Sequence, residues 1–418
     1  MKVGGVIRVP GDKSISHRAL IFAALAAGAS RIRDILPSAD VHSTAGVLGA
    51  LGVPVPPLST DVTIVGRGAR ALTAPVDDLD CGNSGTTTRL VAGIAAARPF
   101  TSRFTGDASL SRRPMRRIAS PLRAMGADVE VAPADGLPMT VRGGNLHAIE
   151  WRSETASAQV KSAILLAAVA SGIAVTVHEP ARSRDHTERM LTALGAAVAV
   201  RGTTVELAPV DGLAPLHMRV PSDPSSAAFL AALAVLATAG ELTLPDVCLN
   251  PTRTGFYRAL ARMGAALTLE DGEPQGGEPV GTIIARASSL TAVDLGRDDV
   301  PSMIDELPLF ACLAARAHGT TTIRGAEELR VKESDRIATV VSNLRAIGVN
   351  ADELPDGMCI EGSDHPLRGR VETRGDHRIA MAFGVLRALP ANAIEIDDPS
   401  CVAVSYPGFW GDLVNACG

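Results

Sequence analysis

The sequence predicts a globular α/β protein with mixed sheets, built from five or six copies of one structural unit. Two observations indicate this fold class: a helix–glycine–strand phrase recurs along the chain, and short β-rich segments separate the copies. A third observation is negative, since no expected strand leads into the GxGxxG turn of a dinucleotide-binding fold. At 418 residues the chain is also too long for one ordinary core, so two large lobes are expected.

Each copy of the recurring phrase predicts a helix that ends at a glycine and is followed by a strand. Apolar residues keep helical spacing before the glycine and alternate after it, and glycine suits the left-handed conformation that ends a helix. The five glycines are Gly52, Gly126, Gly195, Gly264 and Gly348. A sixth, degenerate copy is expected near residues 379–389, so that six units would form two lobes of three. Strands at hairpin edges are expected at residues 62–68, 139–144, 204–212 and 320–326.

Composition narrows the class of partner. No run approaches 18 uncharged apolar residues, and the first 20 residues carry several charges. A cytoplasmic protein, or one whose targeting segment is missing, is therefore expected, with no membrane partner. The net charge of −5 and 3% aromatic content give no reason to expect a nucleic-acid partner. The six cysteines form no CxxC pair, which argues against a zinc ribbon or disulfide framework and favours core-filling thiols. A small-molecule partner is therefore expected.

Two segments combine glycine and hydroxyl residues with cations near an expected helix start. Residues 9–18, VPGDKSISHR, precede a helix expected from about Ala19, and residues 80–89, DCGNSGTTTR, precede one expected over residues 90–97. Free N–H groups at a helix start favour an anion, so both segments could bind phosphate or carboxylate. A P-loop is not favoured, because Asp12 separates Gly11 from Lys13. Ordinary helix capping with solvated basic residues is the alternative.

Further clusters place cations beside hydroxyl or carboxylate groups. They lie at residues 111–117, 157–163, 184–188, 330–336 and 374–378. Each cluster alone is typical of a solvated surface, but their repetition near helix starts favours an anion site. Asp305 and Glu306 precede an apolar helix, and Glu333 adjoins Lys332. A pair of carboxylates among cations could transfer protons, although a charge that favours the helix dipole is the alternative for Asp305.

The order of these motifs is similar to that of a known enzyme family. GDKSISHRAL, GNSGTTTR, RRPM, SAQVKSA, RVKESDR and GDHRIAMAF resemble the 3-phosphoshikimate 1-carboxyvinyltransferase (EPSP synthase) family, and the resemblance extends from residue 7 to about residue 409. It implies the two-lobed enolpyruvyl transferase fold, with six βαββ-type units, three per lobe. One lobe would be discontinuous, with residues 1–12 and 224–418, and would enclose an inserted continuous lobe of residues 13–223. RDHTE, SAQVK and Asn250-Pro251-Thr252-Arg253 resemble the bacterial class II subgroup, which often tolerates glyphosate.

The resemblance also implies an activity and a set of site residues. The family transfers the enolpyruvyl group of phosphoenolpyruvate to the 5-hydroxyl of shikimate 3-phosphate by addition and elimination, in aromatic amino acid biosynthesis, without a metal or other cofactor. Expected contacts of shikimate 3-phosphate are Lys13, Ser14, Arg18, Ser157, Ala158, Gln159, Arg184, Asp305 and Lys332. Expected contacts of phosphoenolpyruvate are Lys13, Gly85, Arg113, Gln159, Arg336 and Arg378. The expected catalytic groups are Asp305, Glu333 and Lys13, with Asp305 on the hydroxyl side, Glu333 at C3 and Lys13 at the bridging oxygen. A monomer is expected.

Two departures from the family pattern carry expectations of their own. Some members have a Lys in the stretch that matches residues 401–407, where this chain has none, so one phosphoenolpyruvate contact is absent or supplied elsewhere. Tolerant members often have Ala where this chain has Gly85, so weaker glyphosate tolerance is expected.

An enolpyruvyl transferase acting on UDP-N-acetylglucosamine usually has a loop cysteine, which residues 109–115 lack. A non-catalytic repeat scaffold is a second alternative, and it predicts dispersed polar residues.

Overall fold

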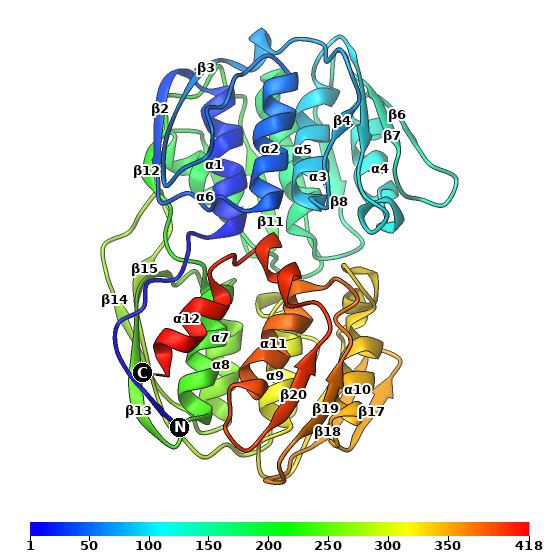
Figure 1. Cartoon of the computed structure of the whole chain (residues 1–418). Coiled ribbons are helices and arrows are strands. Elements are labelled where there is room, and N and C mark those ends of the chain that lie inside the picture. Colours follow the sequence, from blue (N-terminus) through cyan, green and yellow to red (C-terminus); the bar gives the residue numbers. More distant parts are fainter. Residues whose placement is uncertain (418) are drawn as a thin grey trace. The chain divides into compact units, whose positions relative to one another are not determined.

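The computed structural model describes residues 1–417, which form two compact units. Unit 1 comprises Met1–Pro10, Pro221–Glu273 and the described residues from Pro279 onward. Unit 2 comprises Gly11–Val220 and the short segment Pro274–Glu278. The chain therefore passes between the units near residues 10 and 220, and again on either side of residues 274–278 (Figure 1).

Unit 2 combines three sheets with helices α1 to α6 in the described chain. The sheets, in strand order, are β12 (His217–Arg219), β2 (Ala27–Arg33) and β3 (Asp61–Arg67); β4 (Leu79–Asp80), β5 (Thr101–Thr105), β7 (Met139–Arg142) and β6 (Asp128–Val131); and β10 (Val198–Arg201), β11 (Thr204–Leu207), β9 (Val175–His178) and β8 (Ile149–Arg152). Each contains one parallel pair, and its other pairs are antiparallel. The helices are α1 (Lys13–Leu25), α2 (Ala39–Ala50), α3 (Gly85–Ala96), α4 (Arg116–Ala124), α5 (Ala158–Ser171) and α6 (His186–Ala193).

Unit 1 also has three sheets within the described residues, with helices α7 to α12. The sheets are β1 (Lys2–Val3), β13 (Ala239–Cys248), β15 (Val280–Arg286) and β14 (Ala266–Asp271); β16 (Thr320–Ile323), β18 (Gly357–Glu361) and β17 (Ala351–Leu354); and β19 (Arg368–Val371) with β20 (Ala393–Ile396). The helices are α7 (Pro224–Leu236), α8 (Gly255–Arg262), α9 (Leu307–Ala314), α10 (Arg336–Ala346), α11 (His377–Arg387) and α12 (Phe409–Ala416). Segment 274–278 lies between β14 and β15.

The predicted repeat and the α/β fold class with mixed sheets are confirmed. Helices come in pairs, and the first helix of each pair is followed by a strand. All five predicted helix-ending glycines have positive φ, between 86° and 108°, as a left-handed helix end requires. The expected position of the sixth copy is wrong. The five other copies lie at the end of the second helix of each pair, whereas residues 379–389 fall mostly in α11, which is the first helix of its pair. The equivalent helix is α12.

Two predicted helix starts are also wrong, and both errors bear on the site. Helix α1 begins at Lys13 rather than near Ala19, because the Asp12 carboxylate accepts a hydrogen bond from the N–H of Ile15 and caps the helix. Helix α3 begins at Gly85 rather than at residue 90, with the Ser84 hydroxyl as the corresponding cap. The polar motifs are therefore the first turns of these helices.

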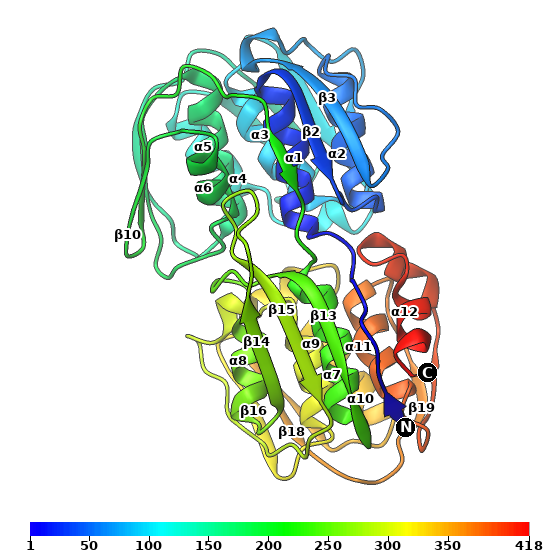
Figure 2. The same ribbon diagram turned by 90° about the vertical axis from the view of Figure 1, so that its left-hand side faces the viewer.

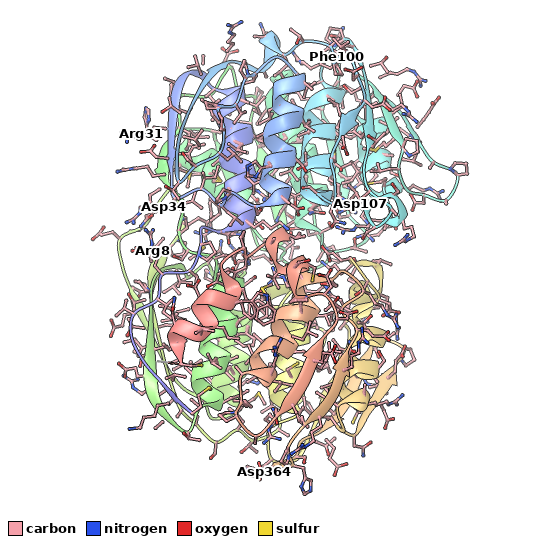
Figure 3. The ribbon with its side chains drawn as sticks, viewed as in Figure 1. Arg8, Arg31, Asp34, Phe100, Asp107 and Asp364 are labelled. Carbon is pink, nitrogen blue, oxygen red and sulfur yellow. The ribbon has the colours of Figure 1, made fainter. Side chains whose placement is uncertain are left out.

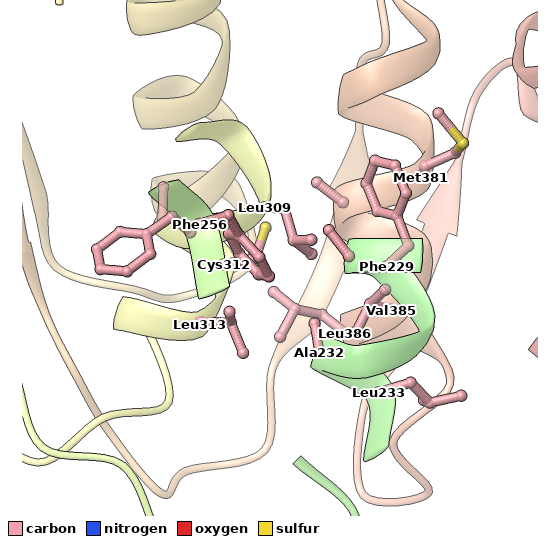
Figure 4. Close-up of a cluster of buried hydrophobic side chains, with 14 of the residues drawn as sticks. Phe229, Ala232, Leu233, Phe256, Leu309, Cys312, Leu313, Met381, Val385 and Leu386 are labelled. Atoms are coloured by element: carbon pink, nitrogen blue, oxygen red, sulfur yellow. The ribbon is translucent and has the colours of Figure 1, made fainter. Parts of the chain in front are cut away.

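The first helices of the pairs form the interior of each unit. Helices α1, α3, α5, α7, α9 and α11 are buried along nearly their whole length. In unit 2, α3 and α5 approach closely at Gly93, which has no side chain. A Cβ at this position would lie only 2.2 Å from the carbonyl oxygen of Ala163. In unit 1, Figure 4 shows Phe229 of α7 near Met381 and Val385 of α11 within one apolar cluster. These rigid helices fix the positions of the side chains on their first turns.

The sheets cover these helices on the outside. Figure 2 shows β2 and β3 beside α1 in unit 2. Charged side chains project from the outer surface, as Arg31 and Asp364 do in Figure 3. Of the cysteines, Cys81, Cys248 and Cys312 are buried and the others are half-buried, and all six carry thiols rather than disulfides. Among the described residues, no helix is both long and apolar enough to span a membrane.

Candidate active site

The first two turns of α1 carry two of the predicted cations of unit 2. The Lys13 ammonium is half-buried and lies 2.5 Å from the carboxylate of Asp40, on α2. Arg18 follows one turn later. Next to them, His17 is buried, and its Nδ1 lies 2.6 Å from the hydroxyl of Thr44. The pKa of His17 is well below its usual value, because burial and the charges of Lys13 and Arg18 disfavour another cation. Lys13 and Arg18 therefore lie close enough to His17 to disfavour its protonation.

The Arg18 guanidinium is buried and held by neutral oxygens. It donates from Nε to the Thr187 hydroxyl at 2.8 Å, from Nη2 to the Ser162 hydroxyl at 2.9 Å and from Nη1 to the Ser14 carbonyl at 3.0 Å. These bonds join α1 to the first turns of α5 and α6. Burial lowers the pKa of Arg18 to about 10, against the opposing pull of Glu188, and the group remains a cation at neutral pH.

The first turns of α3 and α5 meet around Gln159. Its amide oxygen accepts a hydrogen bond of 2.6 Å from Arg89, and its amide nitrogen donates to the Thr86 hydroxyl at 3.0 Å. Gly85 opens α3, and a Cβ there would lie 2.7 Å from Nη1 of Arg89 and 3.5 Å from Nη1 of Arg113. Glycine at this position therefore leaves room for two guanidinium groups beside a helix N-terminus.

The remaining predicted residues of unit 2 lie at the same helix ends. Arg113 is buried and donates to the Asn83 amide oxygen at 2.7 Å, beside the start of α3. Ser157 caps α5 and Ala158 opens it. Arg184 is half-buried just before α6, and its charge also acts to lower the pKa of Arg18. The predicted unit 2 residues therefore gather at the N-terminal ends of α1, α3, α5 and α6.

In unit 1 the predicted residues surround Arg336, the first residue of α10. Its guanidinium is 1% exposed, with Nη1 3.5 Å from the Asp305 carboxylate and Nη2 2.7 Å from that of Glu333. The Lys332 ammonium lies 3.7 Å from the same oxygen of Asp305. The structure thus brings Asp305, Glu333, Lys332 and Arg336 together, although the sequence separates Asp305 from the others by about 30 residues.

A third carboxylate completes the surroundings of Arg336. Asp376 is fully buried, caps α11 and accepts a hydrogen bond of 2.8 Å from Nε of Arg336. Burial disfavours the charged guanidinium, but Asp376, Glu333 and Asp305 outweigh burial and raise the pKa of Arg336 above its usual value. Arg336 is therefore tied to carboxylates on several sides.

Arg378, on the first turn of α11, lies near a second buried carboxylate. Its Nη1 is 3.9 Å from Oε1 of Glu306, the residue next to Asp305. That oxygen also accepts a hydrogen bond from the hydroxyl of Ser225, which in turn accepts one of 2.8 Å from Arg253. The motif Asn250-Pro251-Thr252-Arg253 thus contributes to a buried polar network beneath Arg378.

Among the residues that contact the predicted set, sequence reasoning missed the charged side chains of Asp40, Arg89 and Asp376. Arg89 and Asp376 lie inside motifs that the sequence did single out, so their proximity to other motif residues was the available signal. Asp40 lies in α2 outside every motif, and no sequence feature indicated it. Within the described chain, no group of His, Cys, Asp and Glu side chains could hold a metal ion.

The fold defines a class of protein. NikO from Streptomyces tendae, an enolpyruvyl transferase, has a similar structure, with a TM-score of 0.76 over all of this chain and 95% of that one. At 16% identity this likeness shows the fold alone. The two-lobed enolpyruvyl transferase architecture expected from the sequence is therefore confirmed.

Closer similarities identify the family. The family model for EPSP synthase (3-phosphoshikimate 1-carboxyvinyltransferase) matches residues 1–413. A 3-phosphoshikimate 1-carboxyvinyltransferase of Roseiflexus castenholzii is 46% identical over 98% of this chain and 96% of that protein, and one of Bacillus subtilis is 45% identical over 97% and 95%. EPSP synthase of Acinetobacter baumannii superposes with a TM-score of 0.87 at 41% identity, covering 100% of this chain and 96% of that one. The chain belongs to the EPSP synthase family, and it is an enzyme of the transferase class.

Proposed function

We propose that the protein transfers the enolpyruvyl group of phosphoenolpyruvate to the 5-hydroxyl of shikimate 3-phosphate and releases phosphate. The observation that carries the proposal is the similarity to 3-phosphoshikimate 1-carboxyvinyltransferases over nearly the full length of the chain. The alternatives, transfer to UDP-N-acetylglucosamine and a non-catalytic scaffold, are not favoured by these relatives. The grouping of the predicted polar residues at helix starts also argues against a scaffold.

Shikimate 3-phosphate is assigned chiefly to unit 2. A phosphate carries about −1.5 to −2 charges near neutral pH, and a carboxylate adds another. Arg18 offers a buried cation whose hydrogen-bonding partners in the protein are neutral, and Arg184 offers a second cation nearby. The other proposed contacts are Lys13, Ser14, Ser157, Ala158 and Gln159 from unit 2, with Asp305 and Lys332 from unit 1.

Phosphoenolpyruvate is assigned to cations of both units. Gly85 begins α3 and leaves room beside this helix N-terminus for the guanidinium groups of Arg89 and Arg113, which suits an anionic group. Lys13 and Gln159 would complete the contacts from unit 2. Arg336 and Arg378 are the proposed contacts from unit 1, and their planar guanidinium groups can bind a carboxylate or phosphate through two hydrogen bonds. These two arginines also offer positive charge in place of the lysine that residues 401–407 lack.

Proton transfer is assigned to the carboxylates around Arg336. The reaction needs one group to take the proton of the attacking hydroxyl and one to deliver a proton to C3 of the enol and later remove it. Asp305 is proposed for the hydroxyl, and Glu333 for C3. Lys13 would stabilise charge at the bridging oxygen. The half-buried Asp305 and Glu333 are both within 3.5 Å of Arg336, which supports a shared role.

Phosphate release tests the proposal directly. Purified protein is mixed with phosphoenolpyruvate and either shikimate 3-phosphate or UDP-N-acetylglucosamine, and inorganic phosphate is followed with time. Release that depends on shikimate 3-phosphate alone is the expected result. Release with UDP-N-acetylglucosamine alone, or with neither acceptor, would refute the assignment.

We also infer that this chain is a class II member with weaker glyphosate tolerance than its other motifs suggest. RDHTE, SAQVK and the segment 250–253 support the subgroup, while Gly85 lacks the methyl group that an alanine would place 2.7 Å from Nη1 of Arg89. Inhibition of turnover by glyphosate at low concentration is expected. Activity that persists unchanged at high glyphosate concentration would contradict the inference.

A single chain supplies every residue in this assignment, so we infer that the active form is a monomer. Light scattering coupled to size-exclusion chromatography, at the concentration of the activity assay, is expected to give the mass of one chain, 43.1 kDa. A stable dimer that carries all of the activity would contradict this inference.

A further inference from the structure

Unit 2 contains a cluster of buried charges that the proposed reaction does not use. The Lys161 ammonium, on α5, lies 2.7 Å from a carboxylate oxygen of Glu179 and 2.7 Å from one of Glu188. The three side chains are 1%, 2% and 4% exposed, respectively. Buried ion pairs often stabilise a fold no better than well-packed apolar residues do, because desolvation offsets the attraction. Stability alone is therefore a weak explanation for this cluster.

The cluster is next to the side chains that hold Arg18. Lys161 directly precedes Ser162, and Glu188 directly follows Thr187. The hydroxyls of Ser162 and Thr187 lie 2.7 Å apart, and each accepts a hydrogen bond from Arg18. The ion pair between Lys161 and Glu188 thus joins the first turns of α5 and α6 where those two hydroxyls meet the guanidinium.

Lys161 offsets part of the buried negative charge that lies close to the contacts of Arg18. Lys161 and Arg18 are cations, whereas Glu179 and Glu188 carry carboxylates. Burial disfavours the charge of Lys161, but Glu188 and Glu179 outweigh burial and raise its pKa above the usual value. Burial lowers the pKa of Arg18, and Glu188 is the nearby charge that most opposes this effect. Without Lys161, the Arg18 guanidinium would still interact with a Glu188 carboxylate that had lost its ion-pair partner.

We propose that Lys161 is a positioning residue for shikimate 3-phosphate: it neutralises Glu188 and so keeps the Arg18 guanidinium in place and available for the anionic substrate. The proposal rests on the proposed function, in which Arg18 binds that substrate. Glu179 contacts the same ammonium but follows β9, and it is held separately by the Ser183 hydroxyl. Glu179 therefore provides a matched carboxylate that shares Lys161 without being next to an Arg18 contact.

The first test is Lys161→Met, which keeps an unbranched side chain, one atom shorter, and removes its charge. Calorimetry measures binding of shikimate 3-phosphate alone, and steady-state kinetics give kcat and the KM for phosphoenolpyruvate. We expect the Kd for shikimate 3-phosphate to rise about tenfold or more, with the KM for phosphoenolpyruvate changed by less than about twofold. An unchanged Kd for shikimate 3-phosphate, or an equal loss for both substrates, would overturn the proposal.

Two double variants separate positioning from the general cost of a buried charge. Lys161→Met/Glu188→Gln and Lys161→Met/Glu179→Gln each remove the ammonium and one of its carboxylates, so both restore the charge balance, and thermal unfolding checks that both fold. Only the Glu188→Gln double variant removes the attraction between Glu188 and Arg18. We therefore expect this variant to bind shikimate 3-phosphate about tenfold more tightly than the Glu179→Gln double variant. Equal affinities would overturn the proposal, even if Lys161→Met alone does not fold.

Binding by the unaltered protein keeps this test distinct from the proposed function. If the unaltered protein binds shikimate 3-phosphate and the two double variants do not differ, the role of Lys161 is refuted and the proposed function stands. If the unaltered protein does not bind shikimate 3-phosphate, both the proposed function and the role of Lys161 that rests on it are refuted.

Discussion

Arg18 of unit 2 and Arg336 of unit 1 are both buried arginines at the start of a helix, yet their surroundings differ. Arg18 donates hydrogen bonds to two hydroxyls and a carbonyl, and burial lowers its pKa to about 10. Arg336 contacts the carboxylates of Asp305, Glu333 and Asp376, which raise its pKa above the usual value. The same side chain therefore has neutral hydrogen-bonding partners in one unit and is surrounded by carboxylates in the other.

The different surroundings of Arg18 and Arg336 favour different roles for the two arginines. Burial removes the water that would otherwise stabilise a cation. A buried cation with neutral partners is therefore stabilised strongly when an anion binds next to it. A cation among carboxylates is already largely neutralised, so besides contacting an anionic substrate it holds those carboxylates in fixed positions, where they can exchange protons. Unit 2 is thus suited to binding the phosphorylated acceptor, and unit 1 to proton transfer.

The largest expected effect tests the unit 1 side of this division. Asp305→Asn keeps the shape of the side chain and removes the proton acceptor, so kcat should fall by about 10² to 10⁴-fold, the usual contribution of a general acid or base. The Kd for shikimate 3-phosphate should change much less. Asp298→Asn, at an exposed position of the same unit, is the matched control. Full turnover of Asp305→Asn would remove Asp305 from the mechanism.

The second expected effect compares stability at the two arginines. Arg336→Met leaves three carboxylates close together without their shared cation, and breaking buried pairs in this way costs about 3 to 5 kcal/mol. Arg18→Met leaves neutral partners, so the expected loss is smaller, about 1 to 3 kcal/mol. Urea unfolding of both variants measures the difference in the free energy of unfolding. An equal loss at both positions would mean that their surroundings do not differ in energy.

A third effect concerns affinity at Arg18. Arg18→Lys keeps a positive charge but cannot form all three hydrogen bonds, and hydrogen bonds to charged groups are worth about 1.5 to 3 kcal/mol. The Kd for shikimate 3-phosphate should therefore rise by roughly 10 to 100-fold, as calorimetry can measure. The KM for phosphoenolpyruvate serves as the internal control, and a parallel rise in that KM would contradict the assignment of Arg18 to the acceptor.

The smallest expected effect on the normal reaction is at Gly85. The added methyl of Gly85→Ala would press against the end of Arg89, a side chain that can move, so the KM for phosphoenolpyruvate should rise only by about 2 to 5-fold. Glyphosate is longer, and its inhibition constant should rise by about tenfold or more. Equal changes for substrate and inhibitor would show that Gly85 does not control the space available to the longer molecule.

The sequence alone predicted the repeat better than the local geometry of the site. Helix-ending glycines such as Gly126 follow from a backbone that few other residues adopt, so they were visible without a structure. The start of α1 was missed because its first residues, among them Lys13, Ser14 and Ser16, are polar and do not show apolar helical spacing. The residue that caps this helix is Asp12. The pairing of Lys13 with Asp40 was missed because the contact between α1 and α2 is tertiary.

Segment 274–278 shows a further limit of reading the sequence. It lies between two strands of unit 1, but Glu278 is fully buried and its carboxylate lies 2.7 Å from Nδ1 of His186, in unit 2. Nothing in the glycine-rich composition of residues 272–277 signals such a buried partner. Long-range pairs of this kind depend on the folded backbone, whereas helix ends depend on residues close in sequence.

The most direct test of the division between the units is to measure the Kd for shikimate 3-phosphate and kcat at saturating substrates for Arg18→Lys and Asp305→Asn side by side. The account predicts opposite patterns: Arg18→Lys should lose affinity and keep most of its kcat, whereas Asp305→Asn should keep affinity and lose kcat. If both variants lose affinity and kcat in the same proportion, binding and proton transfer are not divided between the units in this way.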